Sequence, residues 1–207
     1  MTETEPTELT DLLDHLRSEA RADRDDAETP DIGIIMGSDS DLPVMRGAHE
    51  TLSELGFEEA TGDGTDARFA YETYVVSAHR TPTLMDVYAR TAADRGIEVI
   101  IAGAGGKSAD LPNMTASIAY PLPVIGVPVQ EKSVDSVIGM PTGAPIVAVD
   151  AGKSENAALS AVQILARQHP ELRDRLEERH AALQADVATV SRRLHDLGVD
   201  RFSDEER

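Results

Sequence analysis

The feature that most constrains the fold is an alternation of short apolar runs with segments of helical pattern. Each apolar run is long enough for one buried strand. The runs are residues 32–36, 73–76, 99–102, 124–127 and 146–149, and the helical segments between or after them are 42–55, 83–95, a stretch from about 110, a short one around 134, and 155–167. Strands that alternate with helices require right-handed crossovers. The chain is therefore expected to form a parallel sheet covered by helices on both faces.

This pattern predicts a three-layer, doubly wound α/β fold of about five strands in the flavodoxin-like order 2-1-3-4-5. Extra helices are expected at both ends. Leucines at helical spacing in residues 7–22 predict one, and residues 171–197 predict one or two more that suit packing on a neighbouring subunit. The expected division is an acidic N-terminal helix and linker (1–30), a catalytic domain (31–168) and a C-terminal helical extension (169–207).

Composition excludes several function classes. The chain has no cysteine, which excludes disulfides and thiolate chemistry. Its 38 acidic against 19 basic residues give a net charge of −19, which argues against nucleic-acid binding. There is no apolar run of membrane length and no signal-peptide pattern at the acidic N-terminus, so we expect a cytoplasmic protein without membrane contact.

The scarcity of lysine, together with the acidity, suggests a protein from a high-salt cytoplasm. Only Lys107, Lys132 and Lys153 are present. The alternative is an ordinary acidic enzyme.

Ligands of a doubly wound sheet sit beyond the carboxyl ends of its strands, so the residues that follow each strand are candidate site residues. After the first strand, Gly37 permits a tight turn, and Ser38 and Ser40 offer hydroxyl and backbone donors to a phosphate at the next helix. Asp41 is suited either to capping that helix or to binding a ribose hydroxyl. Helix capping alone is the structural alternative for this segment.

The loop after the second strand carries the candidate proton-transfer residue, His79. Pro82 is expected to open a helix and to hold the preceding residues in a non-helical turn that directs His79 to the sheet edge. Ser77 and Ala78 belong to the same turn, and Arg80 is suited to phosphate. The alternative is a histidine that only makes structural hydrogen bonds.

A glycine-rich loop follows the third strand and allows close approach of its backbone to a ligand. Its candidate site residues are Gly103, Ala104, Gly105, Gly106 and Lys107. It is not a Walker A loop, because positions 101 and 102 are Ile and Ala, and it does not match the dinucleotide fingerprint either. A flexible turn is the alternative. Glycines and prolines in 124–129 and 139–143, with the segment from 152 to 158, are expected to form a wall of the same site.

Taken in order, these segments resemble the PurE family of purine biosynthesis, specifically its class I N5-carboxyaminoimidazole ribonucleotide mutases. The motifs that carry the resemblance are GSDSD (37–41), SAHRTP (77–82), AGAGG (102–106), VIGVPV (124–129), MPTG (140–143) and NAALSAVQIL (156–165). The resemblance extends from residue 31 to 167 and is most specific in the first two motifs. It implies a flavodoxin-like fold, an octamer, and a reaction without metal or organic cofactor.

The resemblance also implies site roles. His79 matches the family's catalytic histidine, and Ser38, Asp41 and Arg80 match its ribotide-binding residues. The implied reaction moves a carboxyl group from the exocyclic nitrogen of a phosphorylated imidazole ribonucleotide to ring carbon 4, with carbon dioxide as the intermediate. A histidine of near-neutral pKa in general can donate and accept the protons that such a reaction moves. The glycine loop would close over the carbon dioxide.

The third loop departs from the class I pattern, which usually reads Gly-Gly-Ala-Ala-His-Leu-Pro-Gly. Residues 105–113 of this chain are one residue longer, and Asp110 stands where a second histidine is usual. The Ala-Tyr-Pro at 119–121 resembles class II members, which carboxylate aminoimidazole ribonucleotide directly. We therefore expect the mutase, with the direct carboxylase as the first alternative and a non-catalytic phosphosugar or nucleotide binder as the second.

Overall fold

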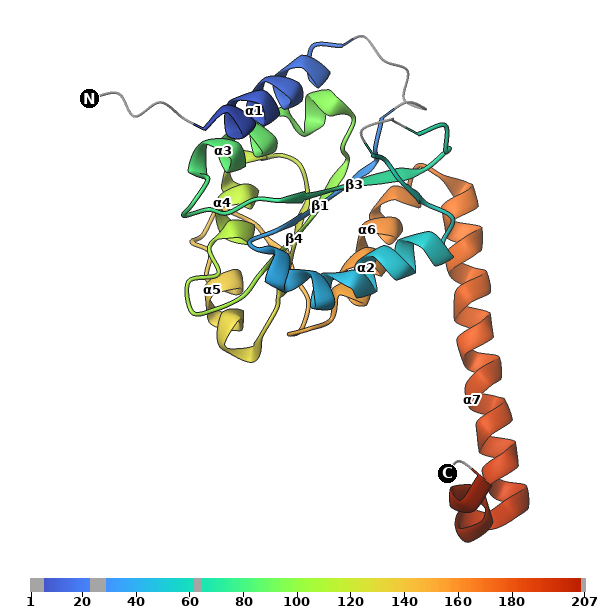
Figure 1. The fold of residues 1–207 in the computed structure, drawn as a ribbon. Helices are drawn as coiled ribbons and strands as arrows, with labels where there is room; N and C mark the ends of the chain where they lie inside the picture. The colour runs from blue at the N-terminus through green and yellow to red at the C-terminus, as the bar shows by residue number, and fades with distance from the viewer. Residues whose placement is uncertain (1–5, 23–28, 62–64, 206–207) are drawn as a thin grey trace. The chain divides into compact units, whose positions relative to one another are not determined.

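The computed structural model describes residues 6–22, 29–61 and 65–205. Its centre is one parallel sheet with the strand order β2-β3-β1-β4-β5-β6. The strands are β1 (Ile32–Met36), β2 (Glu58–Glu59), β3 (Ala70–Val75), β4 (Val99–Ala104), β5 (Val124–Pro128) and β6 (Val147–Ala148). Without the short edge strand β2, the order is the predicted 2-1-3-4-5. The doubly wound, flavodoxin-like α/β fold is thus confirmed (Figure 1).

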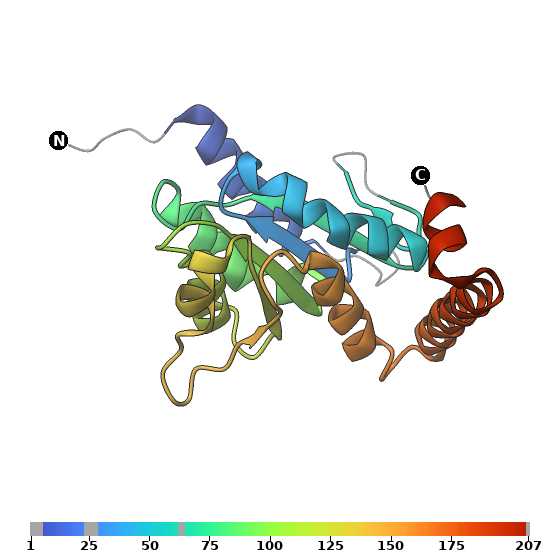
Figure 2. The ribbon, with the colours of Figure 1, turned by 90° about the horizontal axis from the view of Figure 1, so that it is seen from below.

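The described helices are α1 (Thr7–Glu19), α2 (Leu42–Glu54), α3 (Pro82–Thr91), α4 (Leu111–Ile118), α5 (Val134–Ile138), α6 (Ser154–Leu165) and α7 (Pro170–Glu205), with the 3-10 turns η2 (Asp39–Asp41), η3 (Ala93–Arg95) and η4 (Glu131–Ser133). Those before α7 cover both faces of the sheet. Helices α2 and α6 pack together on one face, and α3, α4 and α5 cover the other, with α1 against α3 (Figures 1 and 2).

The chain forms two compact units, Met1–Leu165 and Ala166–Arg207. The helix predicted in residues 7–22 is present as α1, which buries Leu13 and Leu16. Most of the predicted linker after it, residues 23–28, lies outside the described residues. The second unit contains α7, in which Gly198 (φ 72°, ψ 162°) separates two helical parts. One or two helices were predicted over residues 171–197, and a helix is present there. The division into three parts stays a prediction.

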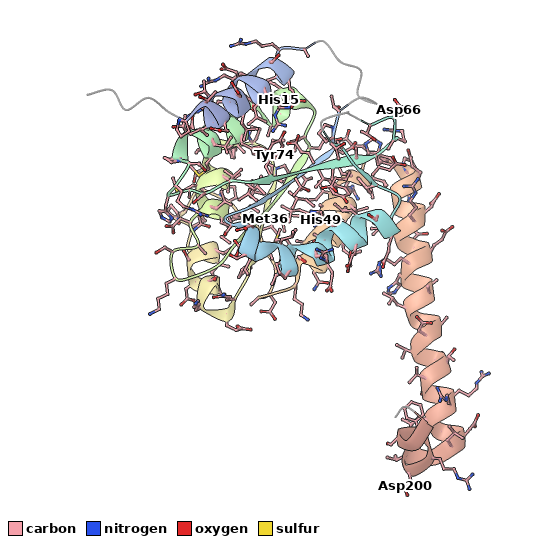
Figure 3. The ribbon with its side chains drawn as sticks, in the orientation of Figure 1. His15, Met36, His49, Asp66, Tyr74 and Asp200 are labelled. Atoms are coloured by element: carbon pink, nitrogen blue, oxygen red, sulfur yellow. The ribbon has the colours of Figure 1, made fainter. Side chains whose placement is uncertain are left out.

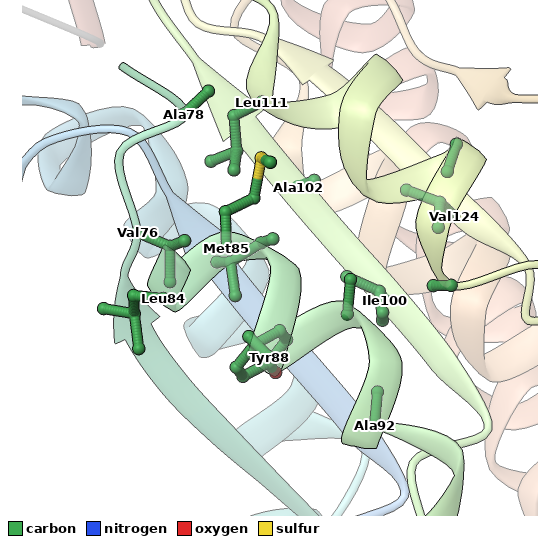
Figure 4. Packing of buried hydrophobic residues seen from close by; sticks show 14 of the residues in the cluster. Val76, Ala78, Leu84, Met85, Tyr88, Ala92, Ile100, Ala102, Leu111 and Val124 are labelled. Carbon is green, nitrogen blue, oxygen red and sulfur yellow. The ribbon is translucent and has the colours of Figure 1, made fainter. Parts of the chain in front are cut away.

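Strand β2 was not predicted, because its two residues are exposed glutamates and leave no apolar run. By contrast, β1 and β4 are buried along their whole length. Side chains from α3 and β4, among them Met85, Tyr88 and Ile100, fill one layer between sheet and helices (Figure 4). Among the described residues, no helix combines the length and the apolar character that crossing a bilayer requires.

A buried ion pair connects strand β3 to the 3-10 turn η3 that follows α3. Arg95 places Nη1 2.6 and 2.7 Å from the two carboxylate oxygens of Glu72, and its side chain is 2% exposed. The same nitrogen lies 3.8 Å from Glu19 on α1. Removing one partner of such a pair leaves an uncompensated buried charge, which costs about 3–5 kcal/mol. The cluster therefore connects α1, β3 and η3.

The contact between α2 and α6 depends on Gly47 and Ser154. The Ser154 hydroxyl accepts a hydrogen bond from the Ala48 N–H at 3.1 Å and donates to the Val44 carbonyl, so it is fixed in position. A Cβ atom on Gly47 would lie 2.8 Å from this hydroxyl oxygen and 2.9 Å from Cγ of Glu155. Glycine is thus required for the close approach of the two helices.

We predict that Gly47→Ala destabilises the protein, although Gly→Ala inside a helix usually stabilises by roughly 0.5–1 kcal/mol. Overpacking costs about 1–3 kcal/mol, and a net loss near 1 kcal/mol lowers the Tm of a chain of this size by about 2–4 °C. Thermal unfolding measures the effect. In a Ser154→Ala background, which removes the hydroxyl, the cost of Gly47→Ala should be smaller. A Gly47→Ala variant as stable as the wild type would contradict the prediction, because it would show that α2 and α6 accommodate the added methyl group without cost.

Candidate active site

The loops that follow β1, β3, β4 and β5 meet at the carboxyl edge of the sheet and enclose a pocket of about 290 Å³. Parallel pairing brings them together, because all four strands end on the same side. The pocket is lined by Gly37, Ser38, Ser40, Asp41, Ser77, Ala78, His79, Ala104, Gly105, Gly106, Ser108, Asp110, Leu111, Gln130 and Lys132. Polar and charged side chains therefore gather where this fold class binds ligands.

The first loop presents Ser38 and Asp41. The Ser38 hydroxyl donates to Asp39 at 3.0 Å and accepts from the Ser40 N–H at 3.4 Å, which starts the 3-10 turn before α2. Asp41 occupies the N-cap position of α2 but makes no capping hydrogen bond with its side chain, which is nearly buried. Of the two roles considered for Asp41, helix capping is not adopted, and the carboxylate lines the pocket instead.

The second loop holds His79 at the pocket and Arg80 at its margin. The Thr81 hydroxyl accepts from the Ser77 N–H at 3.0 Å and donates to the Ser77 carbonyl at 3.1 Å, which closes the turn before α3. Arg80 donates through Nη2 to the Gly37 carbonyl at 3.0 Å and through Nε to the Ser77 hydroxyl at 3.3 Å. The arginine thus joins the first loop to the second.

Glycines at positions 103, 105 and 106 let the third loop approach the first closely. The Gly37 N–H donates to the Gly103 carbonyl at 3.0 Å. A Cβ atom on Gly105 would lie 3.1 Å from Oδ1 of Asp41, so glycine leaves room for that carboxylate. Gly106 has a φ of +87°, a left-handed conformation that favours glycine.

At the end of this loop, Asp110 contacts His79. Oδ2 of Asp110 lies 3.1 Å from Nε2 of His79, and Oδ1 accepts a hydrogen bond from the Ser136 hydroxyl at 3.2 Å. The side chains of His79 and Asp110 are 61% and 41% exposed, so the pair remains open to a ligand.

The site residues predicted after β1, β3 and β4 all line the pocket except Arg80, Gly103 and Lys107. The segments predicted as its wall, 124–129, 139–143 and 152–158, contribute no lining residue. Gly103 lies on β4 below the pocket, where a Cβ atom would meet the sulfur of Met45, and Lys107 is exposed. The roles of the predicted residues in binding and catalysis stay predictions.

Five lining residues were not predicted from the sequence as site residues: Ser108, Asp110, Leu111, Gln130 and Lys132. Gln130 and Lys132 follow β5 directly, so the rule applied to the other strands would have found them.

Two other features of the described residues do not form a catalytic site. His49 lies on α2 (Figure 3), but its ring nitrogens are 3.0 Å from the Met45 carbonyl and 3.0 Å from the Thr73 hydroxyl, which accounts for it structurally. A hollow of about 700 Å³ within residues 166–207 is lined by Ala185, Ala188, Thr189, Arg192, Arg193, Asp196 and Leu197. It has no histidine and lies on a single helical segment. In the described ranges, no group of three or more histidine or carboxylate side chains is placed to hold a metal ion.

The fold and this pocket define a doubly wound α/β protein with a polar pocket at the carboxyl edge of its sheet. Residues 31–186 match the family described as AIR carboxylase, and the chain belongs to that family. The resemblance inferred from the motifs is thereby confirmed, and the match continues beyond residue 167.

Named relatives agree with this assignment. The chain is 43% identical over 179 residues to the N5-carboxyaminoimidazole ribonucleotide mutase of Thermotoga maritima, with 84% of this chain and 96% of that protein covered. It is 42% identical over 186 residues to the phosphoribosylaminoimidazole carboxylase of Schizosaccharomyces pombe, covering 87% of this chain and 31% of that protein. The crystal structure of Treponema denticola PurE has the same fold, with a TM-score of 0.60, 22% identity, and 81% and 98% of the two chains covered.

Burial raises the pKa of Asp41, opposed by a hydrogen bond from the Ser38 backbone and by the positive charge of Arg80. A carboxyl group whose pKa is higher in the folded than in the unfolded protein favours folding only when it is protonated. Its stabilising contribution is therefore fully present below the unfolded pKa of 3.8 and is lost as the pH rises through the higher pKa of the folded protein. At neutral pH the ionised Asp41 destabilises the folded protein.

We predict that Asp41→Asn raises the Tm at pH 7, because it removes a charge that burial disfavours. The difference from the wild type should shrink as the pH falls and should vanish only below the unfolded pKa of 3.8, where the carboxyl group is protonated in both states. Thermal unfolding across this pH range measures it. Asp66→Asn, at an exposed position, is the control and should show no such trend. An Asp41→Asn variant less stable than the wild type at pH 7 would contradict the prediction.

Proposed function

We propose that this chain is an isomerase of purine biosynthesis that converts N5-carboxyaminoimidazole ribonucleotide to 4-carboxyaminoimidazole ribonucleotide. The observation that carries the proposal is the collection of His79, Ser38 and Asp41 in one pocket, with Arg80 at its margin. Family membership supports it, as does the mutase name of the Thermotoga maritima protein.

The first loop and Arg80 would position the substrate. Two hydrogen bonds already fix the guanidinium of Arg80 at the sheet edge, and its remaining N–H groups are available to a phosphate. The Ser38 hydroxyl lies on the same side, and the carboxylate of Asp41 can accept hydrogen bonds from ribose hydroxyls. These contacts would supply position rather than chemistry, which in general lowers the entropic part of a barrier.

His79 would act as both general acid and general base. In the first half of the reaction, the bond between the exocyclic nitrogen and the carboxylate breaks, carbon dioxide leaves, and His79 gives a proton to the nitrogen. In the second half, ring carbon 4 attacks the carbon dioxide, and His79 removes the proton from the tetrahedral carbon. The proton returns to the histidine, so no other reactant is needed. The loop at Gly105 and Gly106 would retain the carbon dioxide and exclude water.

Direct carboxylation of aminoimidazole ribonucleotide by carbon dioxide is the second candidate function. The family description and the name of the Schizosaccharomyces pombe relative favour it. It would use the same pocket and only the second half of the reaction above. A non-catalytic phosphosugar or nucleotide binder is the remaining alternative.

We also infer that the protein is a homo-oligomer, an octamer by resemblance. Its environment would be a high-salt cytoplasm, and residues 31–168 would form its catalytic domain. Helix α7 supports an oligomer, because Leu183, Val187, Val190 and Leu194 are 39–70% exposed at spacings of three and four residues. Such spacing forms an apolar stripe along one side of a helix. The excess of acids over bases supports the high-salt environment.

We predict fast conversion of N5-carboxyaminoimidazole ribonucleotide by the purified protein in molar KCl without bicarbonate. Aminoimidazole ribonucleotide with moderate bicarbonate should be carboxylated poorly. Initial rates of formation of the shared product measure both. Turnover of the second substrate alone would replace the mutase with the carboxylase.

The matched variant for this assay is His79→Asn, which should lower turnover by about 100- to 10,000-fold while the ribotide still binds. His195→Asn, at an exposed histidine of α7, should have no effect. If neither substrate is converted by the wild type, and His79→Asn leaves ligand binding and cellular function intact, the protein is a binder rather than an enzyme.

We predict that the assembly and its activity depend on salt. The net charge of −19 on each chain should drive subunits apart at 0.01 M salt, where the Debye length is about 30 Å, and less so at 1 M, where it is about 3 Å. Light scattering and turnover should both fall in dilute buffer and recover in molar KCl, whereas sucrose should not restore them. An intact, active oligomer in dilute buffer would contradict the high-salt inference.

A further inference from the structure

The contact between His79 and Asp110 bridges the two loops that flank the central strand. β3 and β4 pair with β1 from opposite sides, His79 follows β3, and Asp110 follows β4. Their side chains are in contact, with 3.1 Å between Nε2 of His79 and Oδ2 of Asp110. The carboxylate therefore reaches the proposed proton-transfer residue across the width of the pocket.

The carboxylate of Asp110 is held by other side chains rather than by its own helix. Asp110 is the N-cap residue of α4, yet its side chain makes no capping hydrogen bond. Its Oδ1 accepts instead from the Ser136 hydroxyl of α5 at 3.2 Å. The side-chain amide of Asn113 on α4 donates to the Ser136 carbonyl, which fixes the serine in turn. This chain of contacts leaves Oδ2 directed at His79.

The partner of His79 determines which ring nitrogen carries the proton. An ionised carboxylate can only accept hydrogen bonds, so the nitrogen that faces it must be an N–H donor. In the neutral imidazole, the other nitrogen then has the lone pair. With Nε2 bonded to Asp110, that other nitrogen is Nδ1.

We propose that Asp110 is a positioning residue that holds neutral His79 in the Nε2–H tautomer and makes Nδ1 the nitrogen that exchanges protons with the substrate. The kinetic part rests on the proposed function, because it assumes that His79 transfers protons. The tautomer itself does not depend on which reaction the protein catalyses. A carboxylate that holds a catalytic imidazole in one tautomer is an established device in other enzymes.

The structural arm of the test is NMR of the histidine ring nitrogens in the full-length 15N-labelled protein. At about pH 9, well above the unperturbed histidine pKa of about 6.5, an ordinary imidazole is neutral. The His79 signal is assigned by its absence from His79→Gln. Wild-type His79 should be the Nε2–H tautomer, and Asp110→Asn should lose that preference, because an amide can donate as well as accept. Asp135→Asn, an exposed carboxylate on neighbouring α5, should leave the tautomer unchanged.

The kinetic arm uses the same variants. Asp110→Asn should lower kcat by about 100-fold, within the range of general acid–base contributions, and change KM by less than about twofold. Ser136→Ala should lower kcat less, and Asp135→Asn should match the wild type. Asp110→Asn with the wild-type tautomer would overturn the proposal, whether or not its kcat falls, since a fall would then mean direct contact with substrate. An inactive wild-type enzyme with the predicted tautomer would instead overturn the proposed function and leave the tautomer assignment standing.

Discussion

Parallel hydrogen bonding between β3, β1, β4 and β5 is the constraint on which the site depends. It puts four strand ends on one side of the sheet, so the loops that follow these strands lie next to one another there. Met36 pairs in register with Val75 and with Gly103, so the first three loops leave the sheet at the same level. A shift in this register would move His79 away from Asp110 and Arg80 away from the Gly37 carbonyl. The burial of β1 and β4 is what prevents such a shift.

Close packing at the carboxyl edge of the sheet buries Asp41, which destabilises the folded protein. A role for Asp41 in binding would explain why an acid is present there. Asp41 is nearly buried with no helix-capping bond, and burial raises its pKa. Gly37 and Gly105 leave only enough space for its carboxylate. Residues chosen for stability alone would not be expected to place an acid there, and strain of this kind is common at functional sites. The buried ion pair between Arg95 and Glu72 is not part of the pocket lining.

Much of this arrangement could be predicted from the sequence, since it follows from local pattern. Apolar runs located the main strands, and the rule that ligands bind beyond strand ends led to Ser38, Asp41 and His79. Contacts between distant segments could not be predicted. Asp110 was noticed as unusual, but its bond to His79 depends on how two loops meet across β1, and its bond to Ser136 depends on the packing of α5. β2 was missed because sheet pairing, not side-chain pattern, defines its two glutamates as a strand.

The central claim is that one ligand occupies the pocket with its phosphate near Arg80 and its imidazole ring beside His79. The most direct measurement is a crystal structure of the protein with 4-carboxyaminoimidazole ribonucleotide. The account predicts the phosphate within hydrogen-bond distance of Arg80 and Ser38, the ribose on Asp41, and ring carbon 4 facing Nδ1 of His79. A ribotide bound elsewhere, or bound in the pocket with its ring directed away from His79, would contradict it.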